Sequence, residues 1–397
     1  MAIFPNYFKP LSSSHIHLLR RGLAVWSMKK DVCLESALSR NRRWIVNNQI
    51  KNLLVRSPDR VIPVRSLQKR FKTLDLQGRA LNWLRKYPCC FDLFPEPDGG
   101  ISFGFSKRMA ALVADEQAAI DASEPAMATR LAKLLMLSRD RCLNVVKLNE
   151  LKRALGLPDD YLLRLLPKNP DLFRLVNRYG RRNSMELELA RWNPELAVSA
   201  VEAAATKTGS DPRFACHLPP SWIKTRARFD EFNDAKPYIS PYAENWEPDD
   251  EKRAVGVVHE LLSLTIWKKL SVVKLGHFKR EFGLSQELNR MLLRHPCIFY
   301  VSNRYKIYTV VLREGYNGSE LVDKDPVVVA KERLGELMQE GLHEYNRRRR
   351  LINLEKRRKK GEIEVRQEKE EEDEVLGLDS VEKREERKRF YKVLFDE

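Results

Sequence analysis

The sequence predicts a mostly α-helical protein with short β-hairpins, in which one helix-rich module occurs in three copies and a charged helical tail follows. Three observations lead to this fold class. A ten-residue segment recurs three times without gaps, each copy then changes from a helical to an extended apolar period, and 43% of the 397 residues are hydrophobic. A chain of this length and composition can bury two or three separate cores.

The repeated segment is predicted to form a short helix. Its copies begin at Ile62, Val146 and Val273, and each carries two apolar side chains four positions apart on one helical face. These pairs are Leu67 with Phe71, Leu151 with Leu155, and Phe278 with Phe282. A second helical stretch follows in each copy and ends at the pattern Pro-x-x-Phe, because the residue before a proline is pushed toward extended geometry. The pattern occurs at Pro88–Phe91, Pro170–Phe173 and Pro296–Phe299.

After each Pro-x-x-Phe, two extended stretches flank a polar turn, which predicts hairpins over residues 91–105, 173–189 and 299–311. Another amphipathic stretch precedes each copy, near residues 44–55, 128–137 and 251–266. The order is therefore helix, short strand, helix, helix, hairpin, as in a winged helix-turn-helix module. We predict three degenerate winged-helix-like modules, over residues 41–115, 125–190 and 250–316.

The remaining segments differ in composition. Residues 1–30 combine basic, hydroxylated and bulky apolar side chains with no Asp or Glu, which is typical of an organellar transit peptide. We predict a transit peptide and disordered lead over 1–40, for the mitochondrion rather than the chloroplast because Arg and apolar residues outweigh Ser and Thr. Residues 191–249 contain many Pro and aromatic residues and few Gly or Ser, which indicates an ordered connector. Residues 317–397 form a charged tail, helical or disordered.

The charge balance indicates a polyanionic partner. Lys and Arg number 72 against 55 Asp and Glu, which gives a net charge of +17. Cations and carboxylates nearly balance over residues 347–397, so most of the excess lies on the part expected to fold. Nucleic acid and an acidic membrane surface both fit such a charge. No apolar run approaches the roughly 18 residues that a membrane helix requires, so we expect no membrane insertion.

Cations recur on the helices and hairpin turns of all three copies, where they could line a track for a phosphate backbone. The candidate RNA-binding residues are Lys69, Arg70, Arg85, Lys86, Lys152, Arg153, Arg164, Lys279, Arg280, Arg290, Arg294, Arg304 and Lys306. Nearby aromatic side chains that could stack on unpaired bases are Trp83, Tyr179, Tyr305 and Tyr308. A single cation more often belongs to a solvated face, and a single aromatic to the core, so the prediction depends on the recurrence. The pattern does not separate RNA from DNA.

The sequence carries no recognisable catalytic or cofactor motif. The glycines of Gly99–Ser106 have the spacing of a phosphate loop but lack its lysine, and the pair beginning at His259 lacks the second histidine of a zincin, since Ser263 stands there. The six cysteines form no Cys-x-x-Cys pair, which disfavours both a zinc site and a disulfide framework. We predict a protein that is not an enzyme and has no metal, no cofactor and no small-molecule substrate. A cysteine hydrolase remains a distant alternative.

Several blocks of the sequence resemble the plant organelle RNA recognition domain. They are Arg56–Val64, Tyr87–Phe91, Lys236–Tyr242, Lys274–Phe282 and His295–Phe299, and the similarity covers about residues 41–350 in unchanged order. The resemblance implies a nuclear-encoded plant protein that is imported into mitochondria or chloroplasts. It further implies binding of organellar intron-containing RNA and promotion of group II intron splicing, with other splicing factors as possible partners in a ribonucleoprotein. The family offers no catalytic residues to carry over.

Two functional hypotheses follow from these observations. The resemblance favours an RNA-binding protein that promotes splicing of group II introns, in mitochondrial transcripts or alternatively in the chloroplast. The element order alone would favour a winged-helix DNA-binding protein of the nucleus or nucleoid, because recognition helices of that fold enter the major groove. The sequence leaves the intron target, the protein partners and the oligomeric state open.

Overall fold

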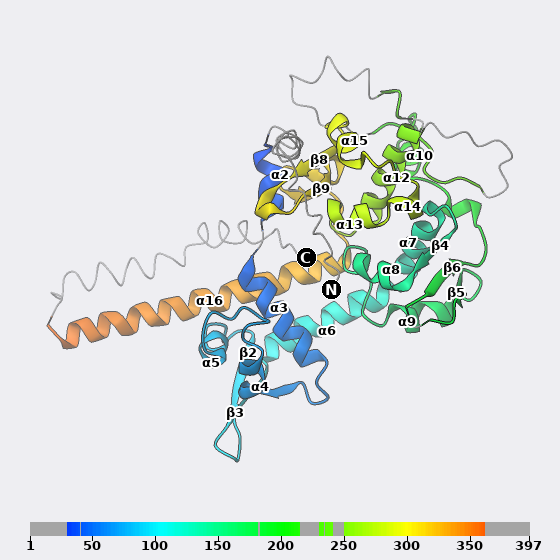
Figure 1. The fold of residues 1–397 in the computed structure, drawn as a ribbon. Coiled ribbons are helices and arrows are strands. Elements are labelled where there is room, and N and C mark those ends of the chain that lie inside the picture. The colour runs from blue at the N-terminus through cyan, green and yellow to red at the C-terminus, as the bar shows by residue number, and fades with distance from the viewer. Residues whose placement is uncertain are drawn as a thin grey trace, which may run out of the picture. The chain divides into compact units, whose positions relative to one another are not determined.

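The computed structural model describes residues 30–39, 41–181, 183–214, 230–233, 235–240 and 250–361 (Figure 1). These residues are mainly helical, with three small three-stranded antiparallel sheets and one two-stranded sheet. The predicted combination of helices with short hairpins is therefore confirmed. The predicted transit peptide lies outside the described residues except for its last part, as does the tail beyond residue 361.

Each copy contains the elements in the predicted order. The first comprises α3 (Arg42–Val55), β1 (Val61–Pro63), α4 (Val64–Lys69), α5 (Ala80–Leu84), β2 (Phe91–Pro95) and β3 (Ile101–Phe105). The second comprises α7 (Glu124–Leu137), β4 (Cys142–Asn144), α8 (Val145–Leu151), α9 (Tyr161–Lys168), β5 (Phe173–Asn177) and β6 (Met185–Leu189). The third comprises α12 (Asp250–Leu264), β7 (Lys269–Ser271), α13 (Val272–His277), α14 (Lys279–Phe282), α15 (Leu288–Arg294), β8 (Phe299–Ser302) and β9 (Thr309–Leu312).

The three sheets share one topology. The short first strand pairs with the second strand of the hairpin, which gives the orders β1-β3-β2, β4-β6-β5 and β7-β9-β8. The middle pairs are Ile62 with Phe103, Leu143 with Leu187, and Leu270 with Val310. Apart from the half-buried Ile62, these side chains are buried, so each sheet turns one face toward the helices of its copy.

The structure corrects the register that sequence matching assigns to the first copy. Aligned by their first strands, the copies begin at Val61, Cys142 and Lys269, so the equivalent of Val146 is Arg65 and not Ile62. As a consequence Phe71, predicted to share the buried face with Leu67, is 39% exposed. A shift of three residues nearly preserves the face of a helix with 3.6 residues per turn, so the apolar period fits both registers.

In the structural register, equivalent apolar side chains form the core of each copy. Leu67, Leu148 and Leu275 are buried on the helix after the first strand. Leu74, Leu155 and Phe282 are buried seven residues later, and Phe91, Phe173 and Phe299 are buried where the hairpins begin. Each buried Leu or Phe contributes roughly 1.5–3 kcal/mol relative to an exposed one. The same positions are therefore apolar and buried in all three copies.

The chain divides into two compact units. One contains described residues up to Glu35, Ala132–Ala154 and Pro170–Tyr316, and the other contains Ser36–Leu131, Leu155–Asn169 and the described residues from Asn317 onward. The first copy lies in the second of these units and the third copy in the first. The second copy contributes its strands and α8 to one unit and α9 to the other. The domain boundaries deduced from the sequence stay a prediction.

Part of the predicted connector is described, in the unit that holds the third copy. Its helix α10 (Ala200–Thr208) starts at Ser199, whose side chain forms a capping box with Glu202. The Phe214 ring lies edge-on to the ring of His259 on α12, with centroids 4.8 Å apart. The Tyr238 hydroxyl donates a hydrogen bond of 2.7 Å to the buried Glu260. These segments therefore pack on α12, whereas residues 215–229, 234 and 241–249 lie outside the described part.

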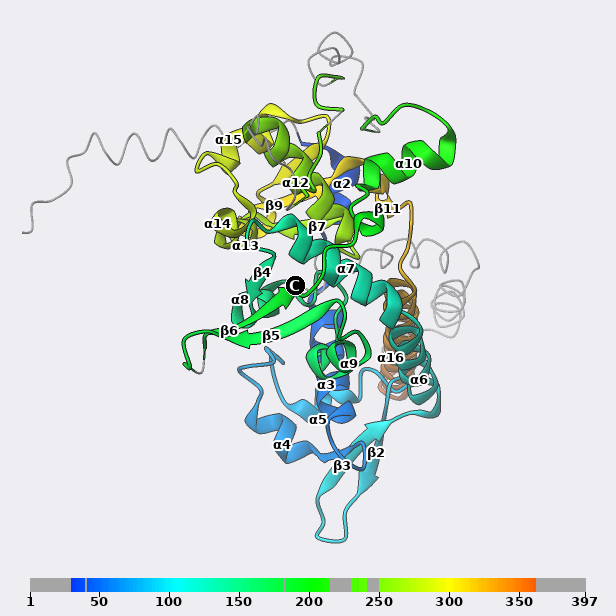
Figure 2. The same ribbon diagram turned by 90° about the vertical axis from the view of Figure 1, so that its right-hand side faces the viewer.

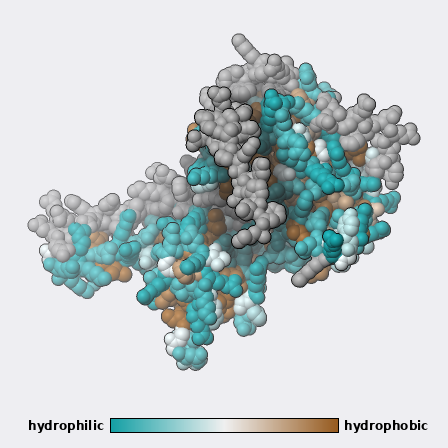
Figure 3. Space-filling model, viewed as in Figure 1, coloured by the Kyte–Doolittle hydropathy of each residue, from teal (hydrophilic) through white to brown (hydrophobic). Residues whose placement is uncertain are grey.

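In the other unit, two long helices lie side by side (Figure 2). They are α6 (Lys107–Ala122) and α16 (Pro326–Lys359), and the Arg108 guanidinium donates to both carboxylate oxygens of Glu340 at 3.2 and 2.7 Å. Pro326 stands at the first position of α16, where its missing N–H is not needed. The face of the described surface seen in Figure 3 is largely hydrophilic. Among the described helices, none combines the length and apolar character needed to cross a membrane.

Candidate nucleic-acid interface

A set of cations lies on α4, in the turn between α4 and α5, and directly after α5, and these two helices contact each other. We call it the first-copy cation cluster, and its members are Arg65, Lys69, Arg70, Lys72, Arg79, Arg85 and Lys86. All are exposed except Lys86, which is half-buried. Four of them were candidates from the sequence, namely Lys69, Arg70, Arg85 and Lys86. Sequence reasoning missed the other three.

The first-copy cation cluster is not neutralised by its surroundings. Asp75 is the one carboxylate between Arg65 and Lys86, and it accepts a hydrogen bond of 2.5 Å from the Arg42 guanidinium. Among the described residues, no member of the cluster has a carboxylate within ion-pair distance. Its charge is therefore available to an external polyanion.

Beneath the cluster, the Trp83 ring packs in the core. It is 5% exposed, and its indole N–H donates a hydrogen bond of 2.8 Å to Asn47. The Lys86 ammonium and the Arg42 guanidinium lie 5.9 and 5.7 Å from the ring centroid. These cation–π contacts orient the two cations. Trp83 thus supports the helix pair and offers no open face to a base.

In the second copy, the candidate on α9 is held in an intramolecular network. The Arg164 guanidinium lies 2.7 Å from Asp160, 2.5 Å from Asp121 and 3.4 Å from Glu124. These hydrogen bonds, that to Asp160 first, raise the pKa of Arg164. A phosphate would have to displace carboxylates to reach it. Of the other two candidates, which follow α8, Lys152 is half-buried and Arg153 is exposed.

The candidates on and around α15 of the third copy are also engaged. Arg294 donates to both carboxylate oxygens of Glu251 at 2.8 and 3.0 Å, and Arg290 lies 3.1 Å from Glu287. Before α15, the Lys279 ammonium donates to a backbone carbonyl at 2.9 Å. These cations complete the fold of their own copy.

The remaining candidates lie on α14 and at the hairpin turn of the third copy. Arg280 on α14 is exposed. The Arg304 guanidinium donates to the backbone carbonyl of Glu35 and stands 5.2 Å from the centroid of the Tyr305 ring. Lys306 is exposed and has a φ of 60°. The structure thus places the thirteen candidates in different environments, and their role in RNA binding stays a prediction.

Two hairpin tips repeat the same tripeptide. Asn177-Arg178-Tyr179 and Asn303-Arg304-Tyr305 occupy equivalent turns in the second and third copies. The Tyr179 side chain is 71% exposed and that of Tyr305 is 49% exposed. Exposed aromatic rings beside cations are the residue types that stack on unpaired bases. Tyr308, the other candidate, is half-buried.

Sequence reasoning also missed three cations with left-handed backbone geometry. Arg60, Arg141 and Lys268 directly precede the first strands of the three copies, with φ of 53°, 54° and 50°. Non-glycine residues are uncommon in this region, so the recurrence is a feature of the repeat. The Lys268 ammonium donates to the Ser263 carbonyl and its stem covers Gly315, whereas Arg60 and Arg141 are exposed. Alignment of the copies by their first strands would have revealed the three positions.

The structure defines a basic repeat protein whose copies each combine a helix pair with a hairpin. The chain belongs to the plant organelle RNA recognition domain family, whose profile matches residues 29–343. The resemblance noted in the sequence is therefore confirmed.

Three relatives illustrate the family. The chain is 34% identical over 333 residues to Protein WHAT'S THIS FACTOR 1 homolog, chloroplastic, of Arabidopsis thaliana, with 78% of this chain and 62% of the relative covered. It is 35% identical to Protein WHAT'S THIS FACTOR 1, chloroplastic, of Zea mays, covering 78% and 66%. It is 30% identical to Protein WHAT'S THIS FACTOR 9, mitochondrial, of Arabidopsis thaliana, covering 73% and 78%. The chain thus spans about two thirds of the length of the first two relatives. No solved structure matches it.

Proposed function

We propose that the protein binds organellar RNA and promotes the splicing of group II introns. Membership of the plant organelle RNA recognition domain family supports RNA as the ligand. The relatives named as chloroplastic or mitochondrial support an organellar location. The observation that carries the proposal is the first-copy cation cluster, in which all cations but Lys86 are exposed and none has a carboxylate partner among the described residues. We assign to it the contact with the RNA backbone.

The contribution of such a protein would be electrostatic. A group II intron must bring its phosphates close together before it can react, and fixed cations on a folded surface offset that repulsion. Each neutralised phosphate makes the slope of log K against the logarithm of the salt concentration steeper by roughly 0.7–0.9. The protein would position the intron and leave the chemistry to the RNA.

The environment of the cysteines supports a role without covalent catalysis. Burial, and after it the neighbouring Glu344, raise the pKa of the Cys89 thiol to about 11. Burial also raises the pKa of Cys90. A nucleophilic cysteine needs the opposite shift. Within the described ranges, no three His, Cys, Asp or Glu side chains are grouped closely enough to hold a metal ion. The distant hydrolase alternative finds no support in these features.

We further propose that the three copies are winged-helix modules. The shared order of elements and the shared sheet order of first, third and second strand support this assignment. In DNA-binding members of that fold the second helix of the pair enters the major groove. Here the candidates on α9 and α15, Arg164, Arg290 and Arg294, are occupied by carboxylates. We therefore place the DNA-binding alternative second.

We propose the mitochondrion as the compartment and the chloroplast as the alternative. The support is the acid-free, Arg-containing composition of residues 1–30, which lie largely outside the described part of the chain. The relatives include proteins named for each organelle, so the choice needs a direct measurement.

The test is recovery of RNA with the tagged full-length protein from purified mitochondria and chloroplasts, followed by sequencing. We expect enrichment of one or a few intron-containing transcripts from one organelle and accumulation of their unspliced forms when the protein is depleted. A variant with Lys69, Arg70 and Lys72 replaced by Ala should lose this enrichment, and one with Arg290 and Arg294 replaced should keep it. Recovery of DNA, or of RNA without preference for introns, would overturn the proposal.

A further inference from the structure

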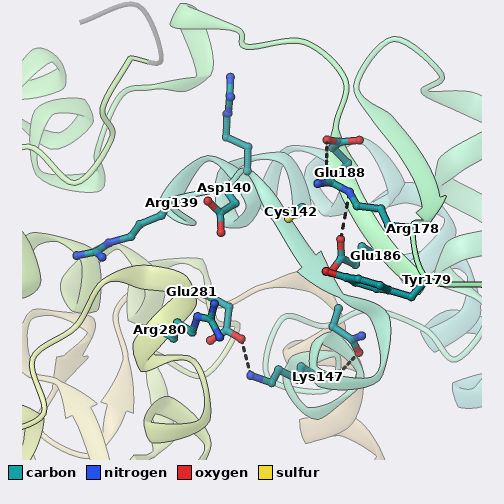
Figure 4. Close-up of a pocket in the computed structure, with 12 residues that line it drawn as sticks. Arg139, Asp140, Cys142, Lys147, Arg178, Tyr179, Glu186, Glu188, Arg280 and Glu281 are labelled. Atoms are coloured by element: carbon teal, nitrogen blue, oxygen red, sulfur yellow. Dashed lines mark hydrogen bonds and ion pairs between the residues drawn. The ribbon is translucent and has the colours of Figure 1, made fainter. Parts of the chain in front are cut away.

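The unit that holds the third copy contains a cavity of about 630 Å³ (Figure 4). Its walls come from the turn between α7 and β4, from α8, from the β5–β6 hairpin and from α14. Binding sites for small molecules commonly have volumes of about 300–1,000 Å³, so the cavity is large enough for a nucleotide.

Ion pairs neutralise part of the cavity wall. The Lys147 ammonium pairs with Glu281, and the Arg178 guanidinium lies 3.0 Å from Glu188 and 3.6 Å from Glu186. The first pair joins α8 to α14, whereas Arg178 and both of its partners belong to the β5–β6 hairpin. Because Arg178 serves two carboxylates, these five side chains together carry a net charge of −1.

Three guanidinium groups remain, against Asp140 and the second carboxylate of the Arg178 pair. Arg139, Arg141 and Arg280 line the cavity, and none of them has a carboxylate within ion-pair distance in the described ranges. Asp140 is the one lining carboxylate without such a cation partner there. The lining holds five cations and four carboxylates, a net charge of +1, and guanidinium groups match the geometry of phosphate.

Backbone geometry positions two of these guanidinium groups. The Arg139 N–H donates to the Glu281 carbonyl at 2.8 Å, and its side chain lies over Gly283. Gly283 has a φ of 64°, and a Cβ there would collide with the Arg139 guanidinium. Arg141 holds a φ of 54°, a geometry that glycine would adopt at lower cost. The close approach at Gly283 and the geometry of Arg141 fix where the two side chains leave the backbone.

Tyr179 completes the cavity from the opposite side. It stands at the tip of the β5–β6 hairpin, and Figure 4 shows its ring extending toward the middle of the cavity, across from Arg139, Arg280 and Glu281. The side chain is 71% exposed, so packing does not account for its position. An aromatic face opposite guanidinium groups matches the two ends of a nucleotide, a flat base and a phosphate.

We propose that this cavity binds one unpaired ribonucleotide, with the base stacked on Tyr179 and its phosphate attracted to the lining guanidinium groups that have no carboxylate partner. The inference rests on the proposed function insofar as bound RNA supplies the nucleotide. Stacking on a single ring accepts every base, so the site selects unpaired nucleotides rather than a sequence. Tyr305 is an exposed hairpin tyrosine that does not line this cavity, so it serves as an internal comparison.

The test is a titration of the full-length protein with free ribonucleoside monophosphates, the matching nucleosides and inorganic phosphate, followed by ligand-observed NMR and calorimetry. We expect the monophosphates to bind and both the nucleosides and inorganic phosphate to bind at least about tenfold more weakly, because each lacks one of the two contacts. Tyr179→Ala should weaken monophosphate binding about fivefold or more. Tyr179→Phe should restore it, and Tyr305→Ala should leave it unchanged. Since Tyr179 is exposed, these variants should fold.

Intron binding is measured in parallel to separate the two proposals. Intron RNA binding with no monophosphate binding would overturn the cavity proposal alone, and so would a Tyr179→Ala variant that binds like the wild type. Inorganic phosphate that binds as well as the monophosphates would reduce the cavity to an anion site and also overturn it. A wild-type protein that binds neither the intron RNA nor the monophosphates would overturn the proposed function as well.

Discussion

Replacement of Lys69, Arg70 and Lys72 by Ala is the perturbation that most directly probes the first-copy cation cluster. These three side chains are exposed and lie at the end of α4 and in the following turn. None has a carboxylate partner in the described part of the chain, so their removal breaks no ion pair. We expect the variant to fold like the wild type and to lose affinity for RNA.

The size of the loss follows from counterion release. If each side chain neutralises one phosphate, the triple variant should lower the slope of log K against log salt by about 2–3. Between 1 M and 0.1 M salt, a slope difference of this size raises the affinity of the wild type over that of the variant by about 100–500-fold. This corresponds to about 3–4 kcal/mol of binding free energy.

The assay is fluorescence anisotropy with a labelled intron RNA at salt concentrations from about 50 to 300 mM, the range over which phosphate contacts change affinity most. The matched control replaces Arg290 and Arg294, whose charges are already paired with Glu287 and Glu251. We expect this control to change affinity by less than about threefold, because phosphate gains little from cations that carboxylates already hold. An unchanged salt slope in the triple variant, or an equal loss in the control, would refute the assignment of RNA contact to the first copy.

Three further predictions concern buried groups. Tyr238→Phe removes the hydrogen bond to Glu260 and should lower the free energy of unfolding by about 1–3 kcal/mol in urea denaturation. The Cys89 thiol, with its pKa of about 11, should react with iodoacetamide at pH 8 about a hundredfold more slowly than free cysteine, as followed by mass spectrometry. Burial lowers the pKa of His295 despite its hydrogen bond to Glu251, so the unfolded chain takes up the proton first. Stability should therefore fall as the pH drops below about 6.5, and His295→Gln should reduce this dependence in denaturation at pH 7.5 and 5.5.

The apolar period of the sequence was sufficient to place the helices and hairpins of all three copies. It could not fix the register of the first copy, because Leu67 lies on the buried face in either alignment. The distinction came from strand pairing, which sets Val61 beside Gly104 and Cys142 beside Glu188. Pairing between residues more than forty positions apart leaves no mark in local periodicity. In the corrected register, Lys72 and not Lys69 is the counterpart of Arg153 and Arg280.

The cations of the candidate site could be read from the sequence, but their availability could not. Arg164 has the same local pattern as other helical cations. Its partners Asp121 and Glu124 stand 43 and 40 residues earlier, and only the fold brings them to it. The two exposed hairpin tyrosines show the same limit, because composition does not tell a packed ring from an open one. Charge type is a local property, whereas solvent access and pairing are tertiary ones.

The divergence of the copies suggests a division of labour among them. A cation can serve either the fold, by pairing with a carboxylate, or a polyanion, by staying unpaired, and the same side chain does both poorly. The fold is served by Arg164, Arg290 and Arg294, which pair with carboxylates. The cations between Arg65 and Lys86 stay unpaired and are available to a polyanion. Apolar packing and the contacts of Trp83 stabilise the helix pair there instead. Every copy keeps one exposed cation at an equivalent position, Lys72, Arg153 or Arg280, whereas the other cations differ between the copies in number and in pairing. The uneven distribution favours backbone contact by the first copy and nucleotide contact by the hairpin of the second.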